Sequence, residues 1–347
     1  MMPEAHHRPL PRAATDFLSV GARARGLSTR LLGRSALEEL AAEPDFASLV
    51  RSLSRKQLLG EPLPEGARLG DLEAAVRHLA ARGLRTLGRW AVQPASLEVF
   101  YADQDRRCLR SLLRGALQGA PAETRLAGLL PTPALPERAL TALAHEPTPR
   151  QVVTHLVLLS HPDASRLLPL VAPVHPSWFE LEVALLAGFV ERSGAAASRD
   201  ENLRDFVAQR VDLMNLATAL LLASSGDGAH DAATCFVPGG RFVTKGLFMK
   251  AAASRAAGGV LVKGLEATPL EDLDAAAFGD PAQLEQAGLK LALAQQRRRF
   301  RIEPTGSAAL MLYLLRLEAQ SSDLFRIAWG VALGAPAALL QRTLVTP

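Results

Sequence analysis

Four carboxylates have the residue type that general acid and base chemistry needs: Asp103, Asp105, Asp212 and Glu318. Such chemistry requires two titratable groups that converge in one cleft. Asp212 follows Asp105 by 107 residues within a similar stretch of sequence, so the acids belong to separate copies of one unit. We therefore do not expect them to converge, and the sequence predicts no catalytic residue.

Two other patterns resemble active-site motifs only in part. Pro238-Gly239-Gly240-Arg241 has the glycines of a phosphate-binding loop, but it lacks the Gly-Lys-Ser/Thr ending and no strand precedes it. Ser160-His161 and His175-Pro176-Ser177 place serine near histidine without the Gly-x-Ser-x-Gly surroundings of a nucleophile elbow. The sequence thus supports neither a nucleotide site nor a hydrolase.

Neither the cysteines nor the N-terminal histidine pair indicates a metal centre. The two cysteines, Cys108 and Cys235, have no metal-ligand spacing, and so few cysteines indicate a reduced, cytoplasmic setting. His6-His7 lies in a polar segment that we interpret as a flexible leader over residues 1–13. We expect no metal and no cofactor.

Charge and hydropathy exclude some classes of partner. The formal net charge is +4, which is too weak and scattered for a nucleic-acid-binding surface. No run reaches the roughly 18 uninterrupted apolar residues of a membrane span. The densest basic run contains Arg297, Arg298, Arg299 and Arg301. We interpret it first as a solvated helix end, and the alternative is a docking patch for an acidic protein partner or lipid headgroups.

The elements that must position these residues are helices. The chain is 48% hydrophobic and only 5% aromatic, which favours helices packed through small aliphatic side chains. Apolar residues between residues 204 and 225 follow a three-four rhythm, and two amphipathic helices are split near Glu43-Pro44. The best strand signal, Gly258–Val262, is too short to imply a sheet.

One unit occurs three times along the chain. Asp105, Asp212 and Gln320 take the first polar position of each copy, at offsets of 107 and 108 residues. The second polar position and the helix-ending glycine keep the same register: Cys108, Asn215 and Asp323, then Gly119, Gly226 and Gly334. A polar pair three residues apart shares one helix face and can bind a neighbouring backbone segment, a structural role that we favour over a partner contact.

A period near 107 residues is the size of a small domain and is too long for a solenoid repeat. We therefore predict three homologous helical domains, over residues 14–119, 120–226 and 227–347. Three such copies favour packing around a pseudo-threefold axis, and a linear array is the alternative.

At this point the chain resembles a known family, the C subunits of V-type ATPases and ATP synthases, whose eukaryotic members are called d subunits. Residues 204–225 followed by Pro238, Gly239, Gly240, Arg241 and Phe242 are similar to the family's middle repeat. Further similar stretches are Ala22-Arg23, Arg30-Leu31-Leu32, Glu303–Gly306 and Leu317-Glu318-Ala319-Gln320. The chain departs from the family pattern at Cys108, Leu317, Gln320 and Asp323.

The resemblance implies an all-α funnel of three domains with pseudo-threefold symmetry, without catalytic activity. Such a protein lies on the cytoplasmic face of the membrane, peripheral to it, and is a socket that couples the central shaft to the proteolipid ring during proton or sodium transport. The implied partners are shaft subunits of the D and F type, the proteolipid c-ring and the membrane stator subunit. No nucleic acid and no small-molecule substrate are expected.

Two other functions stay open on the residues alone. A free-standing helical scaffold descended from the family would show the same threefold repeat. An enzyme with a helical active site would need convergent histidines or carboxylates, which the sequence does not indicate.

Overall fold

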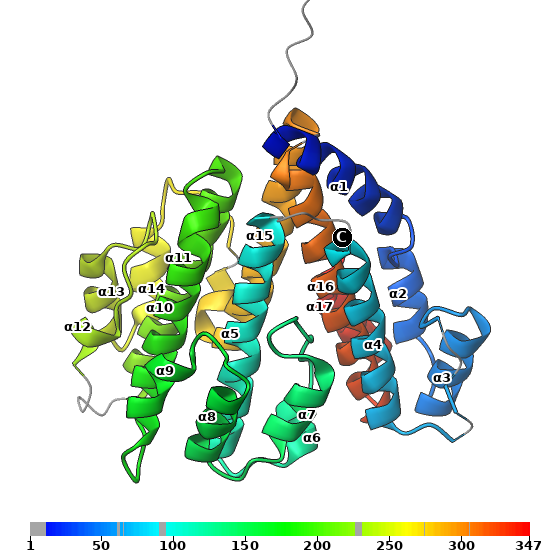
Figure 1. The fold of residues 1–347 in the computed structure, drawn as a ribbon, viewed down its shortest axis with the longest axis horizontal. Coiled ribbons are helices and arrows are strands. Elements are labelled where there is room, and N and C mark those ends of the chain that lie inside the picture. Colours follow the sequence, from blue (N-terminus) through cyan, green and yellow to red (C-terminus); the bar gives the residue numbers. More distant parts are fainter. Residues whose placement is uncertain are drawn as a thin grey trace, which may run out of the picture.

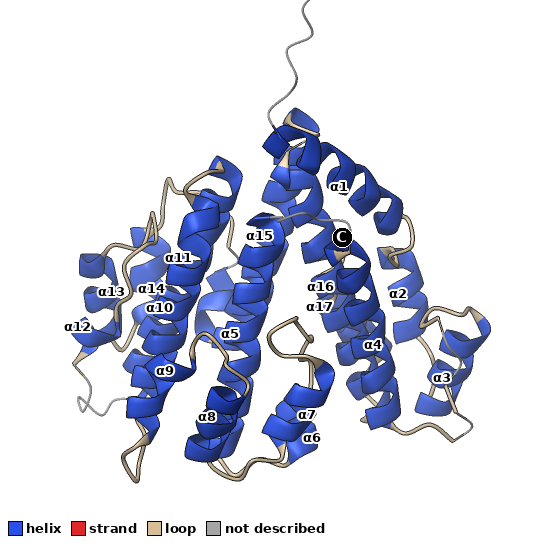
Figure 2. Cartoon of the chain, in the orientation of Figure 1, coloured by secondary structure: helices blue, strands red, loops and turns tan. Residues whose placement is uncertain are grey.

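The computed structural model describes residues 12–60, 63–64, 66–89, 95–225, 231–273, 275–304 and 306–347. These residues form 17 α-helices and two short 3₁₀ helices, without a strand, so the predicted all-α class is confirmed (Figure 2). The helices of the first half are α1 (Arg12–Ser28), α2 (Arg34–Ala41), α3 (Phe46–Arg55), α4 (Leu69–Gly88), α5 (Ala95–Leu117), α6 (Ala122–Leu126), α7 (Glu137–Ala144), α8 (Pro149–Leu158), α9 (Ala164–Leu167) and η1 (Leu168–Val171). Those of the second half are α10 (Trp178–Ala197), α11 (Glu201–Ser225), α12 (Ala232–Cys235), α13 (Lys245–Ala252), α14 (Ala257–Gly264), η2 (Ala275–Gly279), α15 (Pro281–Ile302), α16 (Ser307–Ala332) and α17 (Ala337–Thr343).

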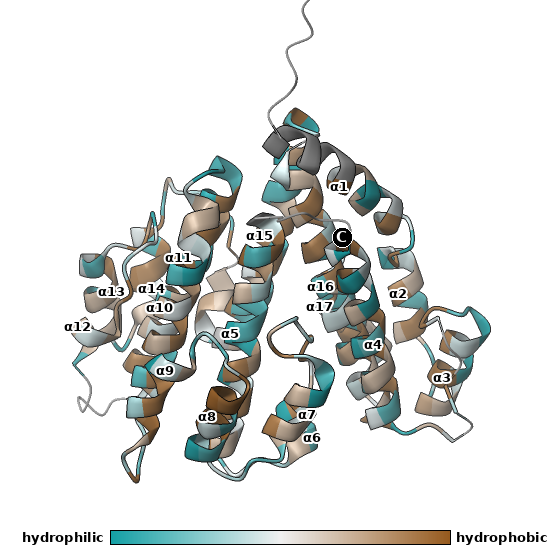
Figure 3. Ribbon diagram, in the orientation of Figure 1, coloured by the Kyte–Doolittle hydropathy of each residue, from teal (hydrophilic) through white to brown (hydrophobic). Residues whose placement is uncertain are grey.

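The long helices run side by side, closer together at the top of Figure 1 than at the bottom, and the short helices lie around their lower halves. α5, α11 and α16, which carry the three sequence copies, contact one another, while α4, α10 and α15 pack against them. Apolar and polar residues alternate along these helices in Figure 3, as expected for helices that bury one stripe. α11 is the exception, because its buried residues surround the whole helix.

The buried side chains form three hydrophobic clusters. One lies within residues 108–185 and a second within residues 213–291. The third combines residues 20–102 with residues 289–345 and ten residues from the range 130–237. The start of a repeating unit can be placed at any residue of the repeat. The boundaries of these clusters do not coincide with those of the predicted domains 14–119, 120–226 and 227–347. Those boundaries stay a prediction.

Helix boundaries follow local chemistry. α3 begins where Asp45 accepts a hydrogen bond from the Ser48 N–H at 2.7 Å, and α8 begins where Thr148 accepts one from the Gln151 N–H at 3.3 Å. Both caps follow the similar stretches Leu40–Pro44 and Leu143–Pro147. The weak strand signal at Gly258–Val262 lies inside helix α14.

Two of the predicted helix-ending glycines have a left-handed backbone. φ is +65° at Gly119 and +71° at Gly334, whereas Gly226 lies outside the described residues. The Gly334 N–H donates to the Val331 carbonyl, and the Ala335 N–H donates to the Gly330 carbonyl. These two hydrogen bonds satisfy carbonyls in the last turn of α16. Gly119 and Ala120 close α5 in the same way.

We expect Gly334→Ala to lower the free energy of unfolding by about 1 kcal/mol, because a Cβ disfavours positive φ. A Cβ there would meet no atom within 4 Å, so the backbone alone sets the effect. Gly194→Ala is the matched control: its Cβ is equally free, but its φ is not positive, so it should stabilise α10 by up to about 1 kcal/mol. Urea unfolding measures both, and changes of the same sign would contradict the assignment.

Candidate functional site

Three charged residues meet where the three central helices contact one another. Asp103, Arg210 and Glu318 occupy equivalent positions of α5, α11 and α16, two residues before the first polar position of each copy. The Arg210 guanidinium lies 3.2 Å from the Asp103 carboxylate and 3.7 Å from the Glu318 carboxylate. All three side chains are buried. We did not expect Asp103 and Glu318 to converge from the sequence, and for these two acids that expectation was wrong.

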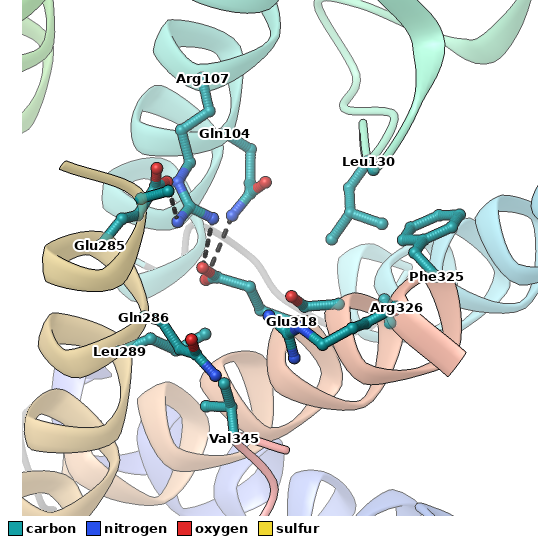
Figure 4. A pocket seen from close by; sticks show the side chains of 14 residues that line it. Gln104, Arg107, Leu130, Glu285, Gln286, Leu289, Glu318, Phe325, Arg326 and Val345 are labelled. Atoms are coloured by element: carbon teal, nitrogen blue, oxygen red, sulfur yellow. Dashed lines mark hydrogen bonds and ion pairs between the residues drawn. The ribbon is translucent and has the colours of Figure 1, made fainter. Parts of the chain in front are cut away.

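A balanced network of charges extends from this point. Arg107 of α5 pairs with Glu318 and with Glu285 of α15, and Gln104 donates to Glu318 at 3.2 Å (Figure 4). The network joins four arginines and four carboxylates: Arg106, Arg107, Arg110 and Arg210 with Asp103, Glu182, Glu285 and Glu318. Five helices contribute, so this is the charged centre of the fold, and we call it the central charge network.

Arginines lower the pKa of two acids of the network, Asp103 and Glu285. Burial alone would raise the pKa of the Asp103 carboxyl, but Arg210, Arg106 and Arg107 together hold that pKa well below its ordinary value. Arg107 lowers the pKa of Glu285 to about 2. A carboxylate that stays ionised and paired neither gives nor takes a proton near neutral pH, so these acids suit ion pairing rather than general acid and base catalysis.

These pKa shifts predict an acid-labile centre. A carboxyl whose pKa is lower in the folded than in the unfolded chain stabilises the fold above its unfolded pKa, and this stabilisation is lost as pH falls. For Glu285 the window runs from 4.5 down to about 2. We expect Glu285→Gln to reduce the slope of the free energy of unfolding against pH in this window. The reduction should correspond to the binding of up to about one proton, and urea unfolding at several pH values measures it. An unchanged slope would contradict the pairing.

A cavity of about 270 Å³ adjoins the network. It lies between α5, α15 and α16, and Figure 4 shows Gln104, Arg107, Glu285 and Glu318 on one side and Leu130 and Phe325 on the other. Because its charged walls are already paired with one another, they offer little net charge to a small ion. The described residues contain no group of three histidine, cysteine or acidic side chains that could hold a metal.

The second polar position of each copy binds the backbone 22 residues further on. Asn215 donates to the Val237 carbonyl at 2.8 Å and accepts from the Val237 N–H at 3.1 Å. The Cys108 thiol donates to the Leu130 carbonyl at 3.3 Å, and Asp323 accepts from the Val345 N–H at 2.8 Å. Three different side chains thus make equivalent contacts. Each attaches the backbone segment 22 residues later to its own central helix.

The first polar position varies more. Asp212 is fully buried and accepts hydrogen bonds from the N–H groups of Arg241, Phe242 and Val243, at 3.0, 3.0 and 2.9 Å. Burial raises the pKa of Asp212, and these three N–H groups oppose the rise. Gln320 instead accepts from the Leu32 N–H at 2.6 Å, so it connects α16 to the N-terminal part of the chain.

Asp212 also explains the glycines of the Pro238–Phe242 loop. Gly239 has φ +120°, which favours glycine. A Cβ on Gly240 would lie 2.0 Å from the Asp212 carboxylate, so only glycine lets the loop approach this close. The loop encloses a carboxylate of its own chain rather than a phosphate.

Asp105 lies in a buried polar cluster that the sequence did not reveal. It accepts hydrogen bonds from Thr132 and, at 2.5 Å, from Arg192 of α10. Arg192 also reaches Asp163 at 3.1 Å, and buried His161 lies 3.7 Å from Asp105. The sequence singled out Asp105 and His161 separately but not their contact, because the hydrogen-bonding partners of Asp105 lie 27 and 87 residues away in the chain.

The remaining sequence candidates are dispersed. Ser160 is exposed with φ +53° while its neighbour His161 is buried, and Ser177 caps α10 by accepting from the Glu180 N–H. In the basic run Arg297, Arg298 and Arg301 are exposed and Arg299 pairs with Asp205 of α11. Most of the N-terminal leader and Thr305 of the Glu303–Gly306 stretch lie outside the described residues.

One described helix is long and apolar enough to cross a membrane by length and composition, α11. However, 72% of its apolar window is buried inside the protein by the other helices, as in the core helix of a folded domain. The finding is therefore weak evidence for a membrane span.

Comparison with known proteins identifies the family. The sequence model of the ATP synthase (C/AC39) subunit family matches residues 20–342. The C subunit of V-type ATP synthase from two strains of Thermus thermophilus is 30% identical over 338 residues, which cover 96% of this chain and all of the relative. The same protein from Deinococcus radiodurans is 28% identical over 270 residues, 76% of this chain and 75% of the relative. The chain belongs to the ATP synthase (C/AC39) subunit family.

Proposed function

We propose that this protein is a non-catalytic central-stalk subunit of a V-type ATP synthase, a socket that couples the rotating shaft to the membrane proteolipid ring during proton or sodium transport. The observation that carries the proposal is the match over the whole length of the Thermus thermophilus relatives, which are C subunits of V-type ATP synthase. A full-length match makes transfer of the role more secure than a match to one segment.

We also propose that the three homologous domains close around a pseudo-threefold axis as a funnel. In a linear array the first and third copies would not touch. Here Gln104 and Arg107 of the first copy contact Glu318 of the third, and Arg210 of the second lies between Asp103 and Glu318. The equivalent 22-residue contacts of Cys108, Asn215 and Asp323 support common ancestry of the copies.

The central charge network suits a part that transmits torque. Close-packed helices resist compression, and the ion pairs of the network join their side chains at defined points. In this role the acids hold helices together and no bond of a substrate changes. The proposed position is the cytoplasmic face of the membrane, peripheral to it, with partners the D- and F-type shaft subunits, the proteolipid c-ring and the membrane stator subunit.

Purification of the tagged chain from native membranes tests the proposal. We expect the shaft subunits and the proteolipid ring to co-purify with the chain in mild detergent. The same tag on an unrelated cytoplasmic protein controls for adhesion to membranes. Recovery of the intact chain without shaft or ring subunits would overturn the rotor role and leave a free-standing helical scaffold.

A further inference from the structure

A second hollow lies on the side of the molecule, between α11 and α15. It has a volume of about 320 Å³, and the Pro238–Phe242 loop and the segment at Pro269 and Leu270 complete its walls. This size is at the lower end of the range for small-molecule sites. We call it the side groove; none of its lining residues belongs to the central charge network.

The charge of the side groove is not balanced. Three arginines line it, Arg241, Arg298 and Arg299, and one carboxylate, Asp205. Asp205 pairs with both Arg241, at 3.3 Å, and Arg299. Arg298 is exposed, and no ion pair of its side chain is found within the described residues. Three positive charges against one negative charge leave the groove with a net charge of +2.

A buried donor adds to this charge. Gln209 of α11 lines the groove and is only 6% exposed, yet its side-chain amide nitrogen has no hydrogen-bond partner among the described residues. A buried donor without an acceptor costs about 1–3 kcal/mol, so an acceptor in the groove would recover stability. By contrast, Gln296 nearby is already fixed by a reciprocal pair of hydrogen bonds with Asn202.

The walls around these polar groups are apolar. Phe206, Phe242 and Leu270 line the groove, and the Arg241 guanidinium lies 5.6 Å from the centre of the Phe242 ring. A ligand that fits the groove therefore needs an anionic end for the arginines and an apolar body for the walls.

We propose that the side groove binds a phosphate monoester carried on an apolar body. A phosphate monoester carries about −1.5 to −2 charge at pH 7, which matches the net charge of the groove. The planar guanidinium groups of Arg298 and Arg241 present paired donors that fit phosphate oxygens, and the Gln209 amide supplies one more donor. Such a group occurs on free organic phosphates and on phosphatidic acid, a lipid. The proposal does not depend on the rotor role.

Calorimetric titration of the full chain with phenyl phosphate and with inorganic phosphate tests the site. We expect phenyl phosphate to bind several-fold more tightly, because its ring removes apolar surface from water. Flotation with phosphatidylcholine vesicles that contain or lack phosphatidic acid distinguishes the two sources. Binding of phenyl phosphate identifies a soluble ligand, and binding only to vesicles with phosphatidic acid identifies a lipid.

Matched variants locate the binding. Arg298→Glu should weaken binding about tenfold or more, whereas Arg301→Glu, the same charge change at a position that does not line the groove, should weaken it much less. Gln209→Met should weaken binding without loss of thermal stability, because it removes an unpaired donor. The proposal is overturned if the wild type binds neither probe, or if Arg301→Glu weakens binding as much as Arg298→Glu.

Discussion

Asp212→Ala is expected to lower the free energy of unfolding by about 3–5 kcal/mol. The Asp212 side chain is the acceptor for three consecutive backbone N–H groups, those of Arg241, Phe242 and Val243. Alanine leaves these donors without an acceptor, at a cost of about 1–3 kcal/mol for each donor that water cannot reach. Val243 is buried, so its N–H should contribute most. Urea unfolding followed by circular dichroism measures the loss.

Asp205→Ala is the matched control, since it removes a carboxylate from the same helix at a partly exposed position, where its partners among the described residues are arginine side chains. Its effect should stay below about 1 kcal/mol. A second comparison uses Gly240→Ala, whose Cβ collides with the Asp212 carboxylate. This substitution should be less destabilising in the Asp212→Ala background than in the wild type. Additive losses, or equal losses for Asp205 and Asp212, would contradict the assigned role.

Much of the helical structure could be predicted from local sequence. The division between α2 and α3 at Glu43-Pro44 and the glycine ends of α5 and α16 depend on residues that are neighbours in the chain. Proline and glycine restrict or free the backbone wherever the rest of the chain lies. The strand signal at Gly258–Val262 was different, because β propensity depends on context, and here Val260 and Val262 lie in a helix whose buried residues are Ala257 and Leu261.

The central charge network was present in the sequence but could not be recognised there. Asp103, Arg210 and Glu318 lie at equivalent positions, yet the second copy carries a base where the other two carry acids, so the search for identical residues did not reveal the match. Their opposite charges are favourable only if the three copies face one another. The sequence did not determine that arrangement, since a linear array satisfied the same repeat.

The polar positions of the repeat show the same limit. The sequence led us to expect that Asp212 and Asn215 bind a nearby backbone segment, and both side chains do so in the structure. Gln320 has the same place in the repeat, but its partner Leu32 lies 288 residues earlier in the chain. Alignment of the three copies could not have indicated this contact, because it depends on how the N-terminal and C-terminal parts of the chain pack together.

Arg210→Met should lower the free energy of unfolding by about 3 kcal/mol. Removal of one partner from a buried ion pair leaves an uncompensated charge, which costs about 3–5 kcal/mol. Here Arg106 still pairs with Asp103, and Arg107 still pairs with Glu318, so the lower end of the range applies. Methionine keeps an unbranched side chain beside Phe206, whose ring centre lies 5.1 Å from the Arg210 guanidinium.

A double-mutant cycle with Asp103→Asn separates pairing from packing. If Arg210 and Asp103 act as a pair, the double variant should lose less stability than the sum of the single variants, by about 0.5–3 kcal/mol. Lys56→Met is the control, because it breaks an exposed ion pair with Glu39 and should cost less than about 1 kcal/mol. Additive losses for Arg210 and Asp103 would show that the three helices are joined by apolar packing alone. Coupling would show that contact between the first and second copies depends on an acid in the first copy that faces an arginine at the equivalent position of the second.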